Sequence, residues 1–161
     1  MLAPVGSFAE LSCSGNEYKM DVTSVMGMSV WASAKALGSR IPDVLGSIQA
    51  SLGSERSALS LELGAGAGLP SLVAASFNYR VIVSDDDADV ERIFANNVQA
   101  NYALVSERAQ FRRLDWDDEE QRTAFASVYP ELFDCIFGTD VLYQAQGMNG
   151  IARTVHHLMR R

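Results

Sequence analysis

The sequence has few cysteines, few basic residues and no long apolar run. Cys13 and Cys135 lie far apart without the spacing of a metal or redox motif, so we expect two reduced thiols in a cytoplasmic protein. No apolar segment reaches membrane-spanning length. The residues after Met1 show neither the basic region nor the apolar core of a signal peptide. The sequence has 13 basic and 20 acidic residues, and the resulting net charge of −7 argues against a nucleic-acid partner.

Histidine is also scarce, and the two that occur do not form a metal site. His156 and His157 follow Ile151 and Val155 on a predicted terminal helix, where solvated histidines are the simplest interpretation. No third ligand is spaced to join them, so we expect no metal. The 161 residues, 48% of them hydrophobic, are enough for one domain with a true core.

The most informative stretch is an apolar run that ends in alternating glycines. Residues 59–63 read as a buried strand, and Gly64, Gly66 and Gly68 follow before Pro70 opens an apolar, helix-compatible segment. Glycine lets the backbone turn sharply and approach a ligand, and the next helix presents free N–H groups. This pattern predicts a ligand cradle at the carboxyl end of a parallel strand, although an ordinary glycine-rich turn is the alternative.

Two further strand ends are predicted to carry acidic residues. Asp85 follows the strand 81–83 about 20 residues after the first glycine, where a carboxylate accepts hydrogen bonds from a ribose diol. Its neighbours Asp86, Asp87 and Asp89 are alternatives that cap the next helix, and both roles can hold at once.

After the strand 110–114, Asp115 and Trp116 form an acid followed by an aromatic, which together can hold an adenine ring. A capping aspartate and a half-buried tryptophan are the alternative interpretation. The apolar strand 133–138 is expected to be central and brings Thr139, Asp140 and Tyr143 to the same rim of the sheet.

The element order predicts an α/β fold with a doubly wound, mostly parallel, Rossmann-like sheet. We expect residues 1–28 to form an extended or irregular arm and residues 29–161 to form the ligand-binding domain. Gly38 should end or interrupt the first helix. The helical segments are expected at about 30–38, 42–52, 69–77, 89–101, 119–128 and 151–158.

The combined pattern resembles class I, seven-strand methyltransferases that use S-adenosylmethionine (SAM). Glu62 completes their E-x-G-x-G-x-G motif, whereas the dinucleotide fingerprint needs one more residue before its third glycine. The wider match is with the group that includes protein-lysine methyltransferases. It covers Gly27–Trp31, Leu61–Pro70, Val83–Asp85 with Asn96–Asn97, Leu114–Trp116 and Asp140–Tyr143.

The resemblance implies a SAM-dependent N-methyltransferase whose favoured target is a protein lysine. A protein arginine, a protein N-terminus and a small amine stay open as substrates. The resemblance also implies that Trp31, Glu62 and the glycine loop lie near SAM, with Asp85 and Thr139 on the same rim. The Asp115–Trp116 pair would line the adenine pocket, and Asp140 and Tyr143 would border the methyl-transfer site. No residue is assigned as a general base.

The family has three further strands, so we expect a sheet that lacks the last three strands at its carboxyl-terminal side. The apolar edge of the strand 133–138 would then be open, so we expect a fragment, a truncated gene product or a half that needs a partner to cover this edge. A catalytically inactive SAM-binding module is therefore one alternative. A nicotinamide-dependent oxidoreductase is another, and the glycine spacing and the lack of a hydride-site acid–base pair argue against it.

Overall fold

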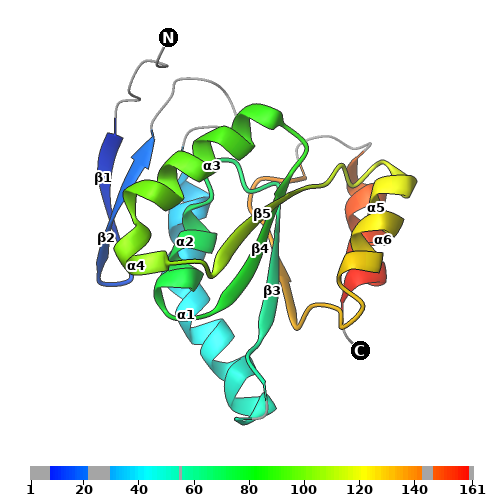
Figure 1. Cartoon of the computed structure of the whole chain (residues 1–161), viewed down its shortest axis with the longest axis horizontal. Helices are drawn as coiled ribbons and strands as arrows, with labels where there is room; N and C mark the ends of the chain where they lie inside the picture. Colours follow the sequence, from blue (N-terminus) through cyan, green and yellow to red (C-terminus); the bar gives the residue numbers. More distant parts are fainter. Residues whose placement is uncertain (1–7, 22–29, 55, 143–146, 160–161) are drawn as a thin grey trace.

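The computed structural model describes residues 8–21, 30–54, 56–142 and 147–159, and its centre is a four-stranded parallel sheet (Figure 1). The strands are β3 (Leu59–Leu63), β4 (Arg80–Asp85), β5 (Ala109–Arg113) and β6 (Cys135–Phe137), in the order β5-β4-β3-β6. The chain first adds strands on one side of β3 and then crosses to the other. The carboxyl ends of β3 and β6 therefore flank the point where such sheets bind ligands, and the predicted fold class is confirmed.

Helices cover both faces of the sheet (Figure 1). On one face lie α1 (Ala32–Leu52), α2 (Leu69–Ser76), α3 (Ala88–Ala100) and α4 (Tyr102–Val105), and on the other lie α5 (Glu119–Val128) and α6 (Gly147–Leu158). Helix α2 is mostly apolar and is buried from Leu69 to Ala75, as expected for a helix enclosed on every side. None of the described helices is long and apolar enough to cross a membrane.

The described part of the expected arm, residues 8–21, is a regular hairpin: it is extended, as one of the two expectations had it, but it is not irregular. Strands β1 (Phe8–Cys13) and β2 (Asn16–Asp21) pair antiparallel across a two-residue turn, in which Ser14 and Gly15 have φ of +50° and +80°. Positive φ at both turn residues matches the twist of a tight hairpin. The side chains of Tyr18 and Met20 are fully buried in the main core, so tertiary packing stabilises the hairpin.

The two helical pieces expected before β3 form one helix, because the hairpin compensates for the break. Pro42 lacks the N–H that would bond to the carbonyl of Gly38. The hydroxyl of Ser14 donates to that carbonyl over 3.1 Å. A Cβ on Gly38 would lie 3.1 Å from Cys13 Sγ, so the glycine admits the close approach of the hairpin.

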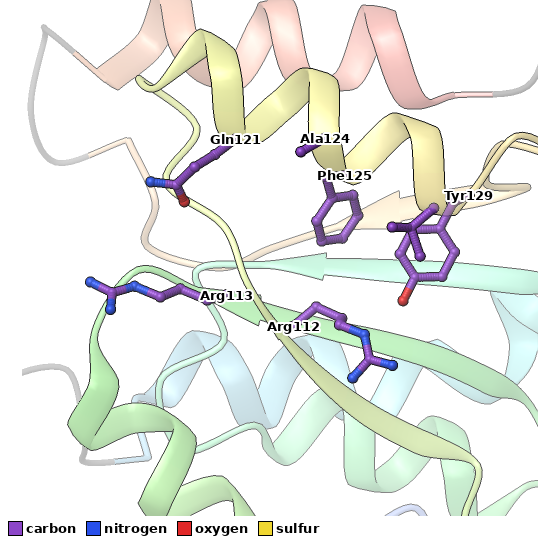
Figure 2. Close-up of a pocket in the computed structure, with 7 residues that line it drawn as sticks. Arg112, Arg113, Gln121, Ala124, Phe125 and Tyr129 are labelled. Carbon is purple, nitrogen blue, oxygen red and sulfur yellow. The ribbon is translucent and has the colours of Figure 1, made fainter.

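A groove lies between β5 and α5 (Figure 2). Its volume is about 230 Å³, and Phe125 and Tyr129 point from α5 toward β5 across it. Arg112 and Arg113 of β5 line it on the strand side. The two aromatic rings have centroids 5.0 Å apart and continue into the second core around Phe133. This groove is therefore part of the α5 packing and lies on the face of the sheet, whereas the glycine loop lies at its carboxyl edge.

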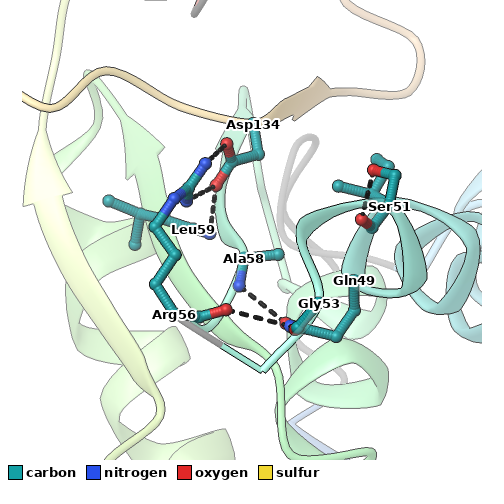
Figure 3. A network of polar contacts seen from close by, with 8 residues as sticks. Gln49, Ser51, Gly53, Arg56, Ala58, Leu59 and Asp134 are labelled. Atoms are coloured by element: carbon teal, nitrogen blue, oxygen red, sulfur yellow. Dashed lines mark hydrogen bonds and ion pairs between the residues drawn. The ribbon is translucent and has the colours of Figure 1, made fainter.

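An ion pair closes the opposite end of the sheet, where β3 and β6 begin (Figure 3). Both guanidinium Nη atoms of Arg56 lie 2.6 Å from the carboxylate oxygens of Asp134, which also accepts a bond from the N–H of Leu59. Gln49 of α1 bonds to the backbone of Ala58 and Arg56. Strand β6 was expected to be central and to span 133–138. In the described sheet it is a three-residue edge strand paired only with β3.

Candidate functional site

The loop after β3 adopts the left-handed conformations that its alternating glycines allow. Gly64, Gly66 and Gly68 have φ of +61°, +51° and +74°. Gly68 precedes α2, and its N–H donates to the carbonyl of Ala65 over 2.8 Å. A Cβ on Gly68 would lie 2.4 Å from a ring carbon of Phe94, so both conformation and space require glycine at this position.

Asp85 at the end of β4 holds this loop in place. One carboxylate oxygen accepts the N–H of Gly66 over 3.0 Å, and the other accepts the N–H of Asp87 over 3.2 Å. Partial burial raises the pKa of Asp85, and these two bonds oppose that effect. Asp87 caps α3 by accepting the N–H of Asp89 over 2.8 Å. Asp87 therefore caps α3, and Asp85 lies at the rim of the sheet and holds the glycine loop.

Glu62 is enclosed beneath the loop. Its side chain is 1% exposed and accepts hydrogen bonds from both the N–H and the hydroxyl of Ser71, in the first turn of α2. Burial raises its pKa to about 8, although the bonds from Ser71 lower it and the charge of Asp85 raises it further. In this arrangement Glu62 fixes the start of α2 behind the loop.

Trp116 and Val141 lie over the first glycine. A Cβ on Gly64 would be 2.7 Å from Val141 Cγ1 and 3.2 Å from the Cη2 atom of Trp116. Asp115 accepts the N–H of Asp117 over 2.8 Å, and Asp118, not Asp115, caps α5. The half-buried Trp116, which follows β5, therefore packs against Gly64 at the end of β3.

Asp140 marks the tip of β6. It has a φ of +56°, is exposed, and accepts a hydrogen bond from Ser33 in the first turn of α1. Trp31, the residue before α1, is 50% exposed. Thr139 is half-buried beside Gly138, whose added Cβ would meet the carbonyl of Leu63 at 2.7 Å. The start of α1 thus joins the rim formed by β3 and β6.

The structure brings most of the predicted residues to one edge of the sheet. Gly64 meets Trp116, Gly66 meets Asp85, and Asp140 meets the segment that follows Trp31. Tyr143 lies outside the described residues. Sequence analysis missed Ser71, Ser33 and Val141, whose contacts with Glu62, Asp140 and Gly64 join distant segments. Serine and valine carry no distinctive signal, so only the folded chain identifies them.

The rim carries several carboxylates but no metal-binding cluster in the described part of the chain. No three His, Cys, Asp or Glu side chains gather there closely enough to hold an ion, as judged over residues 8–21, 30–54, 56–142 and 147–159. Both cysteines are free thiols. The rim instead offers an exposed aromatic, Trp31, and the carboxylates of Asp85 and Asp140. Such groups suit an organic ligand that carries hydroxyl and cationic groups.

Comparison with known proteins gives a family for this site. A family model described as "Lysine methyltransferase" matches residues 16–161. The protein N-lysine methyltransferase METTL21A of Mus musculus is 32% identical over 104 residues, which are 64% of this chain and 45% of the relative. The chain spans less than half the length of the curated relatives that it matches.

Solved structures show the same fold at low sequence identity. SMU.776, a proposed methyltransferase complexed with SAH, superposes with a TM-score of 0.66 at 12% identity. The match covers 99% of this chain and 41% of that one. A SAM-dependent methyltransferase from Agrobacterium tumefaciens gives a TM-score of 0.59 at 18% identity, over 84% of this chain and 40% of that one.

Proposed function

Because the chain belongs to the lysine methyltransferase family, we propose that its sheet edge binds SAM and serves methyl transfer to a protein lysine. The observation that carries this proposal is the glycine loop at the switch point between β3 and β6, with Gly66 held by Asp85. A glycine-rich loop with a carboxylate beside it fits a ligand that has a ribose and a bulky polar group.

The residues present fit this cofactor by their chemistry. At Gly64 the lack of a side chain lets Val141 and Trp116 pack closely on the loop, because a Cβ would lie 2.7 Å from Val141 and 3.2 Å from Trp116. Asp85 keeps further acceptor positions on its two oxygens for ribose hydroxyls, since a carboxylate offers about four. Trp116 and Asp115 would hold the adenine by its ring face and its amino group. Glu62 would affect the cofactor only indirectly, by holding the loop, because its carboxyl group is buried and accepts hydrogen bonds from Ser71.

When bound, SAM supplies a methyl group that its sulfonium charge has already activated, so the chain contributes mainly positioning and desolvation. Asp140 is the group that we propose to orient the substrate amine. It is exposed at the tip of β6, and its φ of +56° is unusual outside glycine. Such backbone outliers gather at functional sites. A carboxylate there would hold an attacking amine by its N–H groups, and Ser33 keeps the carboxylate in place.

The roles of Trp31, Thr139 and Tyr143 remain predictions. Trp31 directly precedes α1, whose Ser33 bonds to Asp140, and Thr139 is the residue before Asp140. A protein substrate follows from the family, and a partner on the open edge of β6 is proposed because the described sheet ends there. A cytoplasmic location also stays a prediction.

Calorimetric titration of the chain with SAM, with NADH as the control ligand, tests the cofactor. We expect SAM to bind and NADH not to bind. Asp85→Asn should weaken SAM binding by about tenfold or more, because one acceptor oxygen becomes a donor. Asp86→Asn is the matched control: its side chain is exposed, and its affinity should stay within about twofold of the native value.

Turnover is measured separately on the chain, with a radiolabelled methyl group and candidate protein substrates. Asp140→Ala should lower turnover while leaving the SAM affinity near the native value, because the residue faces the amine. If a folded chain bound NADH in preference to SAM, the cofactor proposal would be wrong. SAM binding without methyl transfer to any candidate protein would favour the inactive binding module instead.

A further inference from the structure

Helix α3 contacts the glycine loop through a buried asparagine, Asn97. Its side-chain amide donates to the carbonyl of Ala67 over 3.0 Å, and Ala67 lies between Gly66 and Gly68. Its side-chain oxygen accepts the N–H of Asp21, the last residue of the hairpin, over 2.6 Å. Asn97 is 0% exposed, so water does not compete for either bond.

Only one orientation of this amide satisfies both neighbours. The carbonyl of Ala67 can only accept, and the N–H of Asp21 can only donate. An aspartate at position 97 could still accept from Asp21, but it would place a carboxylate oxygen against the carbonyl oxygen of Ala67. A leucine would leave both backbone groups buried without a partner, which is costly in a dry interior.

The loop is therefore held at three successive residues. Asp85 binds the N–H of Gly66, Asn97 binds the carbonyl of Ala67, and Phe94 packs where Gly68 lacks a side chain. Phe94 and Asn97 are three residues apart on α3 and thus lie on one face of the helix. The hydrogen bond to Ala67 turns that carbonyl into the protein and fixes the peptide plane between Ala67 and Gly68.

One turn further along α3, Asn101 makes similar bonds but does not reach the loop. Its side chain accepts the N–H of Lys19 over 2.8 Å and donates to the carbonyl of Lys19 over 2.7 Å. It also donates to the carbonyl of Asn97. Asn97 and Asn101 together attach β2 to α3, but only Asn97 extends the connection to the glycine loop.

We propose that Asn97 is a positioning residue that keeps the glycine loop in its ligand-binding shape. This inference rests on the proposed function, since the loop is taken to receive SAM. A loop that is already ordered loses less entropy when a ligand binds. Loss of the bond from Asn97 should therefore weaken binding without removing any group that touches the ligand.

The test compares Asn97→Asp with Asn101→Asp, two isosteric changes of buried residues on the same helix. Both variants are first checked for folding by far-ultraviolet circular dichroism and urea unfolding. Hydrogen–deuterium exchange then follows the loop peptide 62–72 without ligand, and calorimetry measures SAM affinity. Asn97→Ser is the second variant if Asn97→Asp does not fold, because it removes the amide without burying a charge.

We expect Asn97→Asp to speed amide exchange in the loop and to raise the Kd for SAM about tenfold, which corresponds to one buried hydrogen bond. Asn101→Asp should leave the loop exchange rate and the Kd for SAM within about twofold of the native values, although it destabilises the hairpin. Equal effects of the two variants would overturn the proposal, because the role of Asn97 would then be general stability. Faster loop exchange in a chain that never binds SAM would support the positioning role and refute the proposed function.

Discussion

Gly68→Ala should be among the most destabilising single changes in the loop, for two reasons that can be separated. The backbone at Gly68 has φ of +74° and ψ of +23°, a left-handed conformation that costs a residue with a Cβ about 1–2 kcal/mol. The new Cβ would also lie 2.4 and 2.6 Å from two ring carbons of Phe94.

The ring of Phe94 cannot withdraw easily, because it is 2% exposed and packed in the main core. Overpacking of this kind costs about 1–3 kcal/mol. The total loss for Gly68→Ala is then about 2–5 kcal/mol in the free energy of unfolding, a large part of a typical domain's stability. The assay is equilibrium urea unfolding, with the midpoint compared at unchanged slope.

Gly15→Ala is the matched control for the backbone term. Gly15 has φ of +80° in the hairpin turn, and nothing lies within 4 Å of the Cβ that it would gain. It should lose only the conformational part, about 1–2 kcal/mol. Phe94→Leu in the Gly68→Ala background should recover part of the remaining loss. If Gly68→Ala were no worse than Gly15→Ala, the steric argument at Phe94 would be refuted.

Two further predictions concern buried charge. Because burial raises the pKa of Glu62 to about 8, the native state favours its protonated form, so its contribution to stability is lost as the pH rises from about 4.5 through 8. Glu62→Gln should flatten this dependence between pH 5 and 8 in urea unfolding, and an unchanged pH profile would refute the assignment. Arg56→Lys should lower the urea midpoint, because a lysine cannot pair bidentately with Asp134. Arg92→Lys, which alters the exposed ion pair with Asp89 at 3.4 Å, should leave the urea midpoint unchanged.

The sequence identified features that depend on neighbouring residues along the chain. Alternating glycines after an apolar strand indicate a tight turn, because glycine adopts positive φ without steric cost, and Gly64, Gly66 and Gly68 all have positive φ. The acidic residues after β4 were recognised as a group. The structure then separated them, since Asp87 caps α3 and Asp85 holds Gly66.

Features that depend on contact between distant segments were missed or predicted wrongly. The first long helix was expected to break near Gly38 and Pro42, yet Ser14 from the hairpin supplies the donor that proline lacks. The hairpin itself was not expected, because its stability comes from burying Tyr18 and Met20 against helices far along the chain.

The sequence by itself determined the α/β class, the position of the glycine loop and the acidic strand ends, because these follow from local conformational preference and strand–helix periodicity. The tertiary structure alone decided what supports the loop from behind: Glu62 on Ser71, Phe94 against Gly68, and Asn97 on Ala67. The physical reason is that a buried polar or bulky side chain is defined by its partner, and these partners come from segments that only folding brings together.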